Sequence, residues 1–256
     1  MQEQILEVAL AAAKRGGKIL SSYFNCDGLE CKLKSDRSFV TKADSEAEVA
    51  IVAEIRAHFP EHGILGEEGG EQATGSDYAW VIDPLDGTSN FVNGIPLFSA
   101  SIAVTHKEEP VVAVVHNPVG NFICYASKGR GAFLSDGRAH VSAEGADIGL
   151  VTFGPGKKDK PILNKLLSVS DYYFKSKRYL GCTALELAYL ASGGTEGFVC
   201  LGLNKWDYAA GVLLVREAGG IVSDFKGKPC TLDEGHFLAS NGVVHTELVK
   251  MVASVS

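Results

Sequence analysis

One stretch of the chain decides how it folds, Ala79-Trp80-Val81-Ile82-Asp83-Pro84-Leu85-Asp86-Gly87-Thr88-Ser89-Asn90-Phe91. Its apolar beginning ends abruptly at Asp83, which is typical of a buried strand that presents a carboxylate at its carboxyl end, where ligands of layered α/β proteins tend to bind. We expect Pro84 to end that strand, because proline lacks the N–H that a strand ladder needs. Asp86 follows within a tight turn that Gly87 makes accessible. The stretch therefore predicts two carboxylates held close together.

The same turn carries groups that suit an anion. We expect Thr88 or Ser89 to cap a short helix, and the first N–H groups of a helix attract phosphate. An Asp-Pro-x-Asp-Gly sequence is also a common turn without any ligand, and the stretch alone leaves that interpretation open. With a ligand, the turn would present oxygen acceptors for cations beside N–H donors for phosphate.

Acidic residues are concentrated around this stretch. The chain has 24 Lys and Arg against 31 Asp and Glu, a formal net charge of −7. The segment from Ala57 to His106 has no Lys or Arg, and its acids account for that whole net charge: Glu61, Glu67, Glu68, Glu71, Asp77, Asp83 and Asp86. Unit charges about 4 Å apart repel by about 4 kcal/mol at an effective dielectric of about 20. A divalent cation is the simplest counter-charge, and oxygen ligands favour Mg²⁺, Mn²⁺ or Ca²⁺ over zinc.

Two further motifs add acids from distant parts of the sequence. Gly66-Glu67-Glu68-Gly69-Gly70 follows a short apolar run, and Trp206-Asp207-Tyr208-Ala209-Ala210-Gly211 places an acid at the start of an apolar helix. Taken separately, the first is a solvated loop and Asp207 is a stabilising N-terminal carboxylate, as Asp44 is a helix cap. Their joint appearance favours a shared acidic site.

Composition narrows the class of protein. The chain has 256 residues, 46% hydrophobic and 21% charged, which is typical of one large globular domain or two packed halves. Binding to nucleic acid needs clustered basic residues, so we expect no such partner. No apolar run reaches the roughly 18 residues of a membrane span and the amino terminus lacks a basic signal region, so we expect a cytoplasmic protein away from membranes. The six cysteines show no metal-ligand spacing and are expected to be reduced.

Hydrophobic periodicity predicts an α/β layered fold. The expected helices are 3–22, 45–58, 183–192, 208–218 and 244–252, and the expected strands are 64–65, 78–82, 98–105, 111–116, 122–126, 149–153, 197–201 and 220–223. The middle strands are typical of an antiparallel meander, and strand and helix alternate later. We expect a packed seam near residue 145, with an α+β half (1–145) and an α/β half (146–256) forming one globular unit. Thr41-x-x-Asp44 and Ser45-x-x-Glu48 both have capping-box spacing at the start of the second helix.

The three acidic motifs together resemble a known family. In order and spacing, Gly66-Glu67-Glu68, Asp83-Pro84-Leu85-Asp86-Gly87-Thr88 and the Trp206–Gly211 motif are similar to the inositol monophosphatase family of metal-dependent, lithium-sensitive phosphomonoesterases. The similarity extends through Val40-Thr41-Lys42-Ala43-Asp44, Gly131-Ala132-Phe133, Glu217-Ala218-Gly219-Gly220 and Ala239-Ser240-Asn241, nearly the whole chain. It implies a five-layer α-β-α-β-α sandwich and a homodimer.

The resemblance also implies a set of metal ligands. Glu67, Asp83 and the Leu85 carbonyl would hold one Mg²⁺, and Asp83, Asp86 and Asp207 a second, with two or three Mg²⁺ per site and Mn²⁺ as a substitute. Such a pair of cations stabilises the attacking and leaving oxygens of an in-line displacement.

Catalytic roles follow from the same resemblance. Glu67 and Thr88, with Asp44 behind Thr88, would help a water activated by metal to attack phosphorus. Gly87, Thr88 and Asp86 would surround the phosphate.

The residues that would contact the alcohol part of the substrate point to more than one substrate. The resemblance places Gly181-Cys182-Thr183, Gly154-Pro155-Gly156, Cys200 and Asp207 beside the alcohol. Many inositol-preferring members carry Glu at the position of Cys200, and a thiol is a poorer acceptor for a ring hydroxyl. Lys34-Ser35-Asp36-Arg37-Ser38 resembles relatives that act on histidinol phosphate, whereas residues 86–91 resemble the inositol branch.

We therefore expect Mg²⁺-dependent hydrolysis of a small phosphorylated alcohol, inositol 1-phosphate first and histidinol phosphate as the alternative. Fructose 1,6-bisphosphate hydrolysis is a further alternative. A non-catalytic regulatory or scaffold protein on the same fold is the alternative from a different class.

Overall fold

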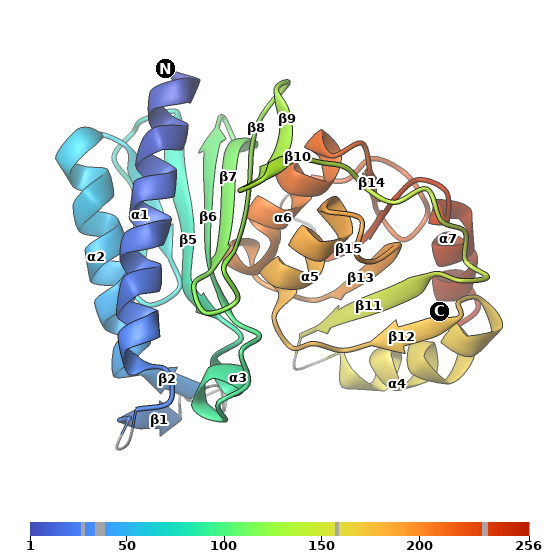
Figure 1. Ribbon diagram of the computed structural model, residues 1–256. Coiled ribbons are helices and arrows are strands. Elements are labelled where there is room, and N and C mark those ends of the chain that lie inside the picture. Colours follow the sequence, from blue (N-terminus) through green and yellow to red (C-terminus); the bar gives the residue numbers. More distant parts are fainter. Residues whose placement is uncertain (27–28, 34–38, 157–158, 232–234, 256) are drawn as a thin grey trace.

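Two β-sheets and the helices around them make up the molecule (Figure 1). The computed structural model describes residues 1–26, 29–33, 39–156, 159–231 and 235–255. The Lys34–Ser38 stretch, on which the comparison with histidinol phosphate relatives rests, lies outside these described residues.

The first sheet has eight strands in the order β10-β9-β8-β7-β6-β5-β3-β4. Its strands are β3 (Gly63–Gly66), β4 (Gly70–Gln72), β5 (Tyr78–Asp86), β6 (Ser99–His106), β7 (Glu109–Asn117), β8 (Phe122–Ser127), β9 (Gly131–Leu134) and β10 (Gly137–Ala139). From β5 to β10 each strand pairs antiparallel with the next, which confirms the predicted meander for the strands from 78 to 126; the predicted strand at 64–65, β3, runs parallel to β5 and is not part of it. The central strands β6 and β7 are buried on nearly every residue, because helices cover both faces of the sheet.

The second sheet has five strands in the order β12-β11-β13-β15-β14. They are β11 (Leu150–Pro155), β12 (Ser176–Arg178), β13 (Gly197–Leu201), β14 (Ile221–Ser223) and β15 (His236–Ser240). The strand β11 runs parallel to β12 and β13, whereas β15 runs antiparallel to β13 and β14. The first sheet ends at Ala139 and the second begins at Leu150, and a domain seam near residue 145 stays a prediction.

Helices complete a five-layer α-β-α-β-α sandwich, as the resemblance implied (Figure 1). The outer pair α1 (Gln2–Tyr23) and α2 (Lys42–His58) packs on the first sheet. Ile5 of α1 and Ile51 of α2 belong to the same buried cluster as Trp80 of β5. The central pair α5 (Thr183–Ala191) and α6 (Lys205–Glu217) fills the space between the sheets, and its leucines and alanines are buried on all sides. The helices α4 (Lys160–Val169) and α7 (His245–Ala253) cover the far face of the second sheet.

The remaining elements are short. They are the hairpin β1 (Cys31–Leu33) and β2 (Phe39–Thr41), the helix α3 (Thr88–Val92) and the 3₁₀ turn Ser170–Tyr172. Within the part of the chain that the structure describes, no helix combines the length and the apolar character that crossing a membrane requires. All six cysteines are free thiols.

Three local predictions were wrong. The second helix begins at Lys42 rather than at Ser45, because Thr41-x-x-Asp44, and not Ser45-x-x-Glu48, forms its capping box. The strand β5 does not stop at Pro84 but continues to Asp86, and its pairing register with β6 shifts between Asp83 and Asp86. Proline is tolerated there because the irregular pairing removes the need for its N–H.

The third correction concerns the short helix after β5. Thr88 is its first residue rather than its cap, and the cap position belongs to Gly87 in the left-handed conformation, with φ of 87°. The hairpin β9–β10 and the strand β15 were not predicted, because their short runs lack a clear period.

Candidate metal and phosphate site

Asp83 stands at the centre of the acidic site. The strand β5 delivers its carboxylate into the interior, where only 1% of the residue is exposed. Burial raises the pKa of Asp83 well above its usual range, and the charges of Glu67, Asp86 and Asp207 raise it further. Four acids from three separate segments therefore act on one another through space, as the motifs predicted.

Backbone pairing places Glu67 beside Asp83. Glu67 follows β3 directly, and its N–H donates to the carbonyl of Ile82 at 3.1 Å, one residue before Asp83. The parallel pairing of β3 with β5 thus brings two acids to the same edge of the sheet. Asp83 Oδ1 accepts the N–H of Leu85 at 2.9 Å, and among the described residues no hydrogen bond reaches Oδ2.

Asp86 ties the end of β5 to the start of the central helix α5. Its Oδ2 accepts the N–H of Ala184 at 2.6 Å and the thiol of Cys182 at 3.2 Å. Burial raises the pKa of Asp86 to about 7, although these donors act in the opposite direction. An acid at the first turn of a helix is favoured by the unpaired N–H groups there.

Asp207 has both of the roles that the sequence left open. It is the third residue of α6 and forms a capping box with Asn204, whose N–H donates to Asp207 Oδ2 at 2.8 Å. It also contributes to the raised pKa of Asp83. The N-terminal carboxylate of an apolar helix is therefore also a member of the acidic site.

Asp44 and Thr88 form a connected pair. Asp44 Oδ2 accepts the N–H and hydroxyl of Thr41 at 2.8 and 2.6 Å, which completes the predicted capping box. Asp44 Oδ1 lies 3.3 Å from Thr88 Oγ1, which also lies 3.0 Å from the carbonyl of Leu85. Burial raises the pKa of Asp44 to about 6. The Thr88 hydroxyl thus has an acceptor on either side.

The donors in this region fit a hard divalent cation in type and charge. Carboxylates and one carbonyl are oxygen ligands, and no described Lys or Arg pairs with Asp83 or Asp86. Among the described residues, however, no three His, Cys, Asp or Glu side chains lie close enough together to hold a metal ion as they stand. The fit is therefore one of chemistry and electrostatics, and the side chains would have to close around a cation.

A cavity of about 150 Å³ lies against these acids. Its lining includes six of the predicted residues and two that the sequence reasoning missed, Tyr179 and Leu203; the predicted ones are Asp86, Gly154, Pro155, Gly181, Thr183 and Asp207. Tyr179 is 58% exposed. Neither residue belongs to a recognisable motif, so only the position of Tyr179 two residues before Gly181 gave any signal.

Two predicted substrate residues lie elsewhere. Cys182 and Cys200 are fully buried, and neither is among the described residues that line the cavity. The Cys182 thiol contacts Asp86, and the Cys200 thiol donates to the carbonyl of Gly235 at 3.3 Å. Their influence on a substrate would pass through the residues that they support.

Comparison with known proteins shows which family has this sequence and fold. The model of the inositol monophosphatase family matches residues 1–256. The chain belongs to the inositol monophosphatase family. Members of this family are generally metal-dependent phosphatases, which agrees with the oxygen donors around Asp83.

Individual family members carry two kinds of name. The Nus factor SuhB of Escherichia coli K12 is 41% identical over 243 residues, covering 93% of this chain and 91% of that protein. The inositol-1-monophosphatase of Mesorhizobium japonicum is 38% identical over 259 residues, covering 97% and 96%. The crystal structure of the extragenic suppressor protein suhB from Bartonella henselae has a TM-score of 0.92 at 34% identity and covers 97% of this chain and 98% of that one.

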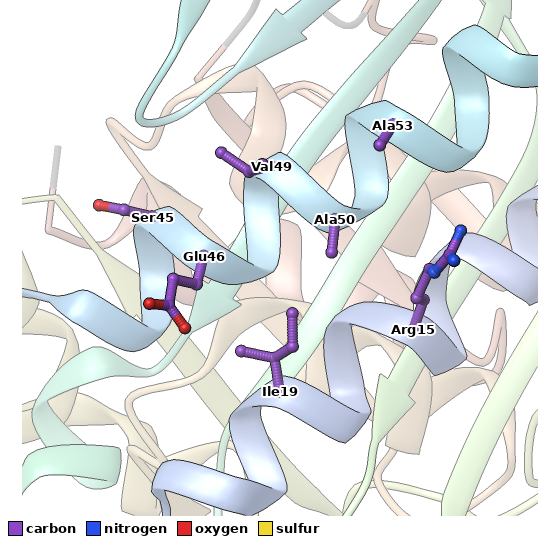
Figure 2. Close-up of a pocket in the computed structure, with 7 residues that line it drawn as sticks. All are labelled: Arg15, Ile19, Ser45, Glu46, Val49, Ala50 and Ala53. Carbon is purple, nitrogen blue, oxygen red and sulfur yellow. The ribbon is translucent and has the colours of Figure 1, made fainter.

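A larger cavity of about 530 Å³ lies on the outer face of the molecule, between α1 and α2. Figure 2 shows Ile19 of α1 and Ala50 of α2 pointing toward each other across it. Arg15, Ser45, Glu46, Val49 and Ala53 complete its lining. The walls are mostly aliphatic and hold one acid, so this groove lacks the converging carboxylates of the site around Asp83.

Proposed function

We propose that this protein is a Mg²⁺-dependent phosphatase of a small phosphorylated alcohol, with inositol 1-phosphate as the substrate. One observation carries the proposal. The charges of Glu67, Asp86 and Asp207 act on the buried carboxylate of Asp83, three residues before the end of β5, the strand that leads directly into Gly87 and Thr88. Acids that repel one another in the interior need a cation, and the turn beside them suits a phosphate.

The ligands of Mg²⁺ would be Glu67, Asp83, the Leu85 carbonyl, Asp86 and Asp207. When bound, Mg²⁺ lowers the pKa of a water and stabilises negative charge on the oxygens around phosphorus. Phosphate monoesters hydrolyse extremely slowly in water, so the site must provide strong, fixed charge.

The protein's own groups orient the nucleophile and the phosphate. The Thr88 hydroxyl donates to Asp44 Oδ1 or to the Leu85 carbonyl, which leaves its lone pairs to accept a hydrogen bond from the attacking water. The N–H of Thr88, the first residue of α3, has no acceptor four residues before it within the helix, whereas the N–H of Gly87 donates to the Asp86 carboxylate; both N–H groups would bind the phosphate oxygens of a substrate. The cavity next to Asp86 and Asp207 would receive the alcohol.

A phosphate-release assay tests this function. The substrates are inositol 1-phosphate, histidinol phosphate, fructose 1,6-bisphosphate and a 3′-phosphonucleotide, each with Mg²⁺, with a chelator, and with added Li⁺. We expect inositol 1-phosphate to give the highest kcat/KM and the chelator to stop turnover. Faster hydrolysis of histidinol phosphate would change the proposed substrate and leave the reaction class standing.

The variant Asp83→Asn tests the site. Loss of the shared ligand should lower kcat at saturating Mg²⁺ by at least about 100-fold, since outer-shell partners alone account for 10–100-fold. Asp77→Asn is the matched control, because Asp77 lies one residue before the same strand, has a side chain 62% exposed and pairs with Lys107. Full turnover of Asp83→Asn would refute the assignment of the site.

A second candidate function rests on the names of relatives. Several proteins that are 41% identical to this chain are called Nus factor SuhB, a name that states no phosphatase activity. If no substrate in the assay releases phosphate, a regulatory role on the same fold becomes the better proposal. A pull-down with the wild-type chain and Asp83→Asn would then show whether partner binding depends on the acidic site.

A further inference from the structure

Glu48 is a buried carboxylate for which the reaction outlined above has no use. It lies on α2, one helical turn after Asp44, and only 6% of it is exposed. Its spacing from Ser45 predicts a capping box, but Thr41 and Asp44 form the box at this helix start. The structure gives the Glu48 side chain a different set of partners.

Those partners are in the turn that carries Glu67. Glu48 Oε2 accepts the N–H of Glu68 at 3.0 Å, and Oε1 accepts the N–H of Gly69 at 2.6 Å. Hydrogen bonds from N–H groups to an ionised carboxylate are about twice as strong as neutral ones. One side chain of α2 therefore holds two successive backbone groups of the β3–β4 turn.

Glycines make room for this carboxylate. A Cβ at Gly66 would lie 2.8 Å from the carboxyl carbon of Glu48, and a Cβ at Gly69 would lie 2.6 Å from Oε1. Glycine on both sides of the Glu67-Glu68 pair is thus explained by the close approach of Glu48, and not by a left-handed backbone at either position.

Glu67 is consequently held from both sides. Its own N–H donates to the carbonyl of Ile82, which fixes it relative to β5, and the two residues after it are fixed by Glu48. The same face of α2 holds Thr88 through Asp44. Two carboxylates one turn apart on a single helix thereby set the distance between the Glu67 turn and the Thr88 turn.

We propose that Glu48 is a positioning residue that orients Glu67 toward Asp83 and so raises the affinity of the site for Mg²⁺. This inference rests on the proposed function, because it assumes that Glu67 is a ligand. The glutamine of Glu48→Gln would accept one of the two N–H groups and point its own N–H₂ group at the other. The turn would therefore lose one of its two hydrogen bonds to α2.

The first experiment measures Mg²⁺ affinity of the full chain by titration calorimetry. We expect Glu48→Gln to weaken Mg²⁺ binding by about 10-fold or more, within the range for outer-shell partners of metal ligands. Glu54→Gln is the matched control on the same helix, because Glu54 pairs with Arg15 and should leave the affinity within about twofold. Equal affinity of Glu48→Gln and the unmodified protein would overturn the proposal.

A variant that keeps the charge of Glu48 but moves its carboxylate separates the effect of its position from the effect of its charge. Gly66→Ala leaves every acid in place but forces the Glu48 carboxylate away from the turn. We expect it to weaken Mg²⁺ binding as Glu48→Gln does. If Gly66→Ala binds Mg²⁺ normally, Glu48 acts only through its charge and the proposal is wrong.

Hydrogen exchange without metal gives a separate readout. In a chelator, the amides of Glu68 and Gly69 should exchange at least about 10-fold faster in Glu48→Gln than in the unmodified protein, while amides of the central strand β7 stay unchanged. Unchanged exchange at the two amides overturns the proposal. If the unmodified protein binds no Mg²⁺, the proposed function fails together with this inference. If the unmodified protein binds Mg²⁺ and the variants bind it equally tightly, this inference alone fails.

Discussion

The side chains that face the 150 Å³ cavity are of two kinds. Asp86 and Asp207 are acids and Thr183 and Tyr179 carry hydroxyls, whereas Pro155 and Leu203 are apolar. A polyol has hydroxyl groups around its whole ring, and the carboxylates and hydroxyls of this lining would be their hydrogen-bond partners. On the proposed function, the side chains of this cavity would select the alcohol, whereas the acids of the site would act on the phosphate.

Tyr179→Ala tests this division. Loss of the ring should raise KM by about 10-fold and leave kcat within about twofold, because an aromatic contact contributes about 0.5–1.5 kcal/mol and the ring would touch the alcohol rather than phosphorus. Steady-state kinetics with the preferred substrate measure both constants. Tyr172→Ala is the control, since Tyr172 is 86% exposed and outside the lining. A fall in kcat with unchanged KM would contradict the assignment.

Between elements, the turn from β5 to α3 is the most constrained connection of the site. Gly87 has φ of 87°, and a Cβ there would lie 2.8 Å from the carbonyl oxygen of Leu97 and 3.1 Å from the Cβ of Cys182. Both the backbone conformation and the space require glycine. The position that would bind phosphate is therefore fixed by packing between β5, α5 and the segment before β6.

Gly87→Ala should destabilise the protein by about 2–4 kcal/mol, from a strained backbone and a clash that must be relieved. Gly75→Ala is a control that isolates the strain, because Gly75 has φ of 78° but no atom within 4 Å of a Cβ. We expect it to lose only about 1–2 kcal/mol. Urea unfolding measures both. Equal losses would mean that the close contacts at Gly87 relax without cost.

A stack of rings joins α2 to the first sheet. His62 lies between Phe59 and Tyr78, with ring centroids 4.7 and 5.0 Å away, and its Nδ1 accepts the indole N–H of Trp80 at 3.1 Å. Burial lowers the pKa of His62 from its usual value of 6.5. The neutral ring is the form that accepts this hydrogen bond.

The sign of the pH dependence follows from that lowered pKa. The unfolded chain takes up the proton of His62 at a higher pH than the folded protein does, so stability from this group is present above pH about 6.5 and is lost as the pH falls toward the folded value. His62→Gln should therefore lose less stability than the unmodified protein between pH about 7.5 and 5. Urea titrations at several pH values measure this, and parallel curves would contradict it.

For the whole molecule, the main electrostatic consequence of the site is repulsion between the acids of the first sheet, Glu67, Asp83 and Asp86, and Asp207 of α6. Without a cation, Asp83 and Asp86 are buried with raised pKa values, and folding works against that repulsion. A cation that binds only the folded state stabilises it by about 2.7 kcal/mol at about 100 times its Kd.

Mg²⁺ should accordingly raise Tm. For a protein of this size 1 kcal/mol corresponds to about 2–4 °C, so saturation at about 100 times Kd should raise Tm by about 5–10 °C over the protein in a chelator. Asp83→Asn should show a smaller rise and a higher Tm in the chelator, because one buried charge is gone. Differential scanning calorimetry measures both. An unchanged Tm would exclude a cation site formed by the folded chain.

Much of this molecule could be predicted from sequence because its signals are local. The period of 3.6 residues in 3–22 gave α1, the alternating and apolar runs gave the meander from β5 to β8, and Thr41 with Asp44 gave a helix start. Local rules failed where a tertiary contact replaced a local one. Pro84 lies inside β5 because the pairing with β6 is irregular there, and Glu48 holds a turn rather than a cap.

The acids of the candidate site could be predicted from their residue types and order. An apolar run followed by Asp-Pro-x-Asp-Gly predicts two closely spaced carboxylates whatever the fold. What only the tertiary structure decided is which donors each acid accepts a hydrogen bond from. Asp86 gives Oδ2 to Ala184 and Asp207 gives Oδ2 to Asn204. Tyr179 lines the cavity, whereas Cys200 of β13 is fully buried and is not among the described residues that line it. Sequence determines the inventory of charges and periods, whereas burial, hydrogen bonding and distance arise only when segments more than 100 residues apart are packed together, as Asp83 and Asp207 are.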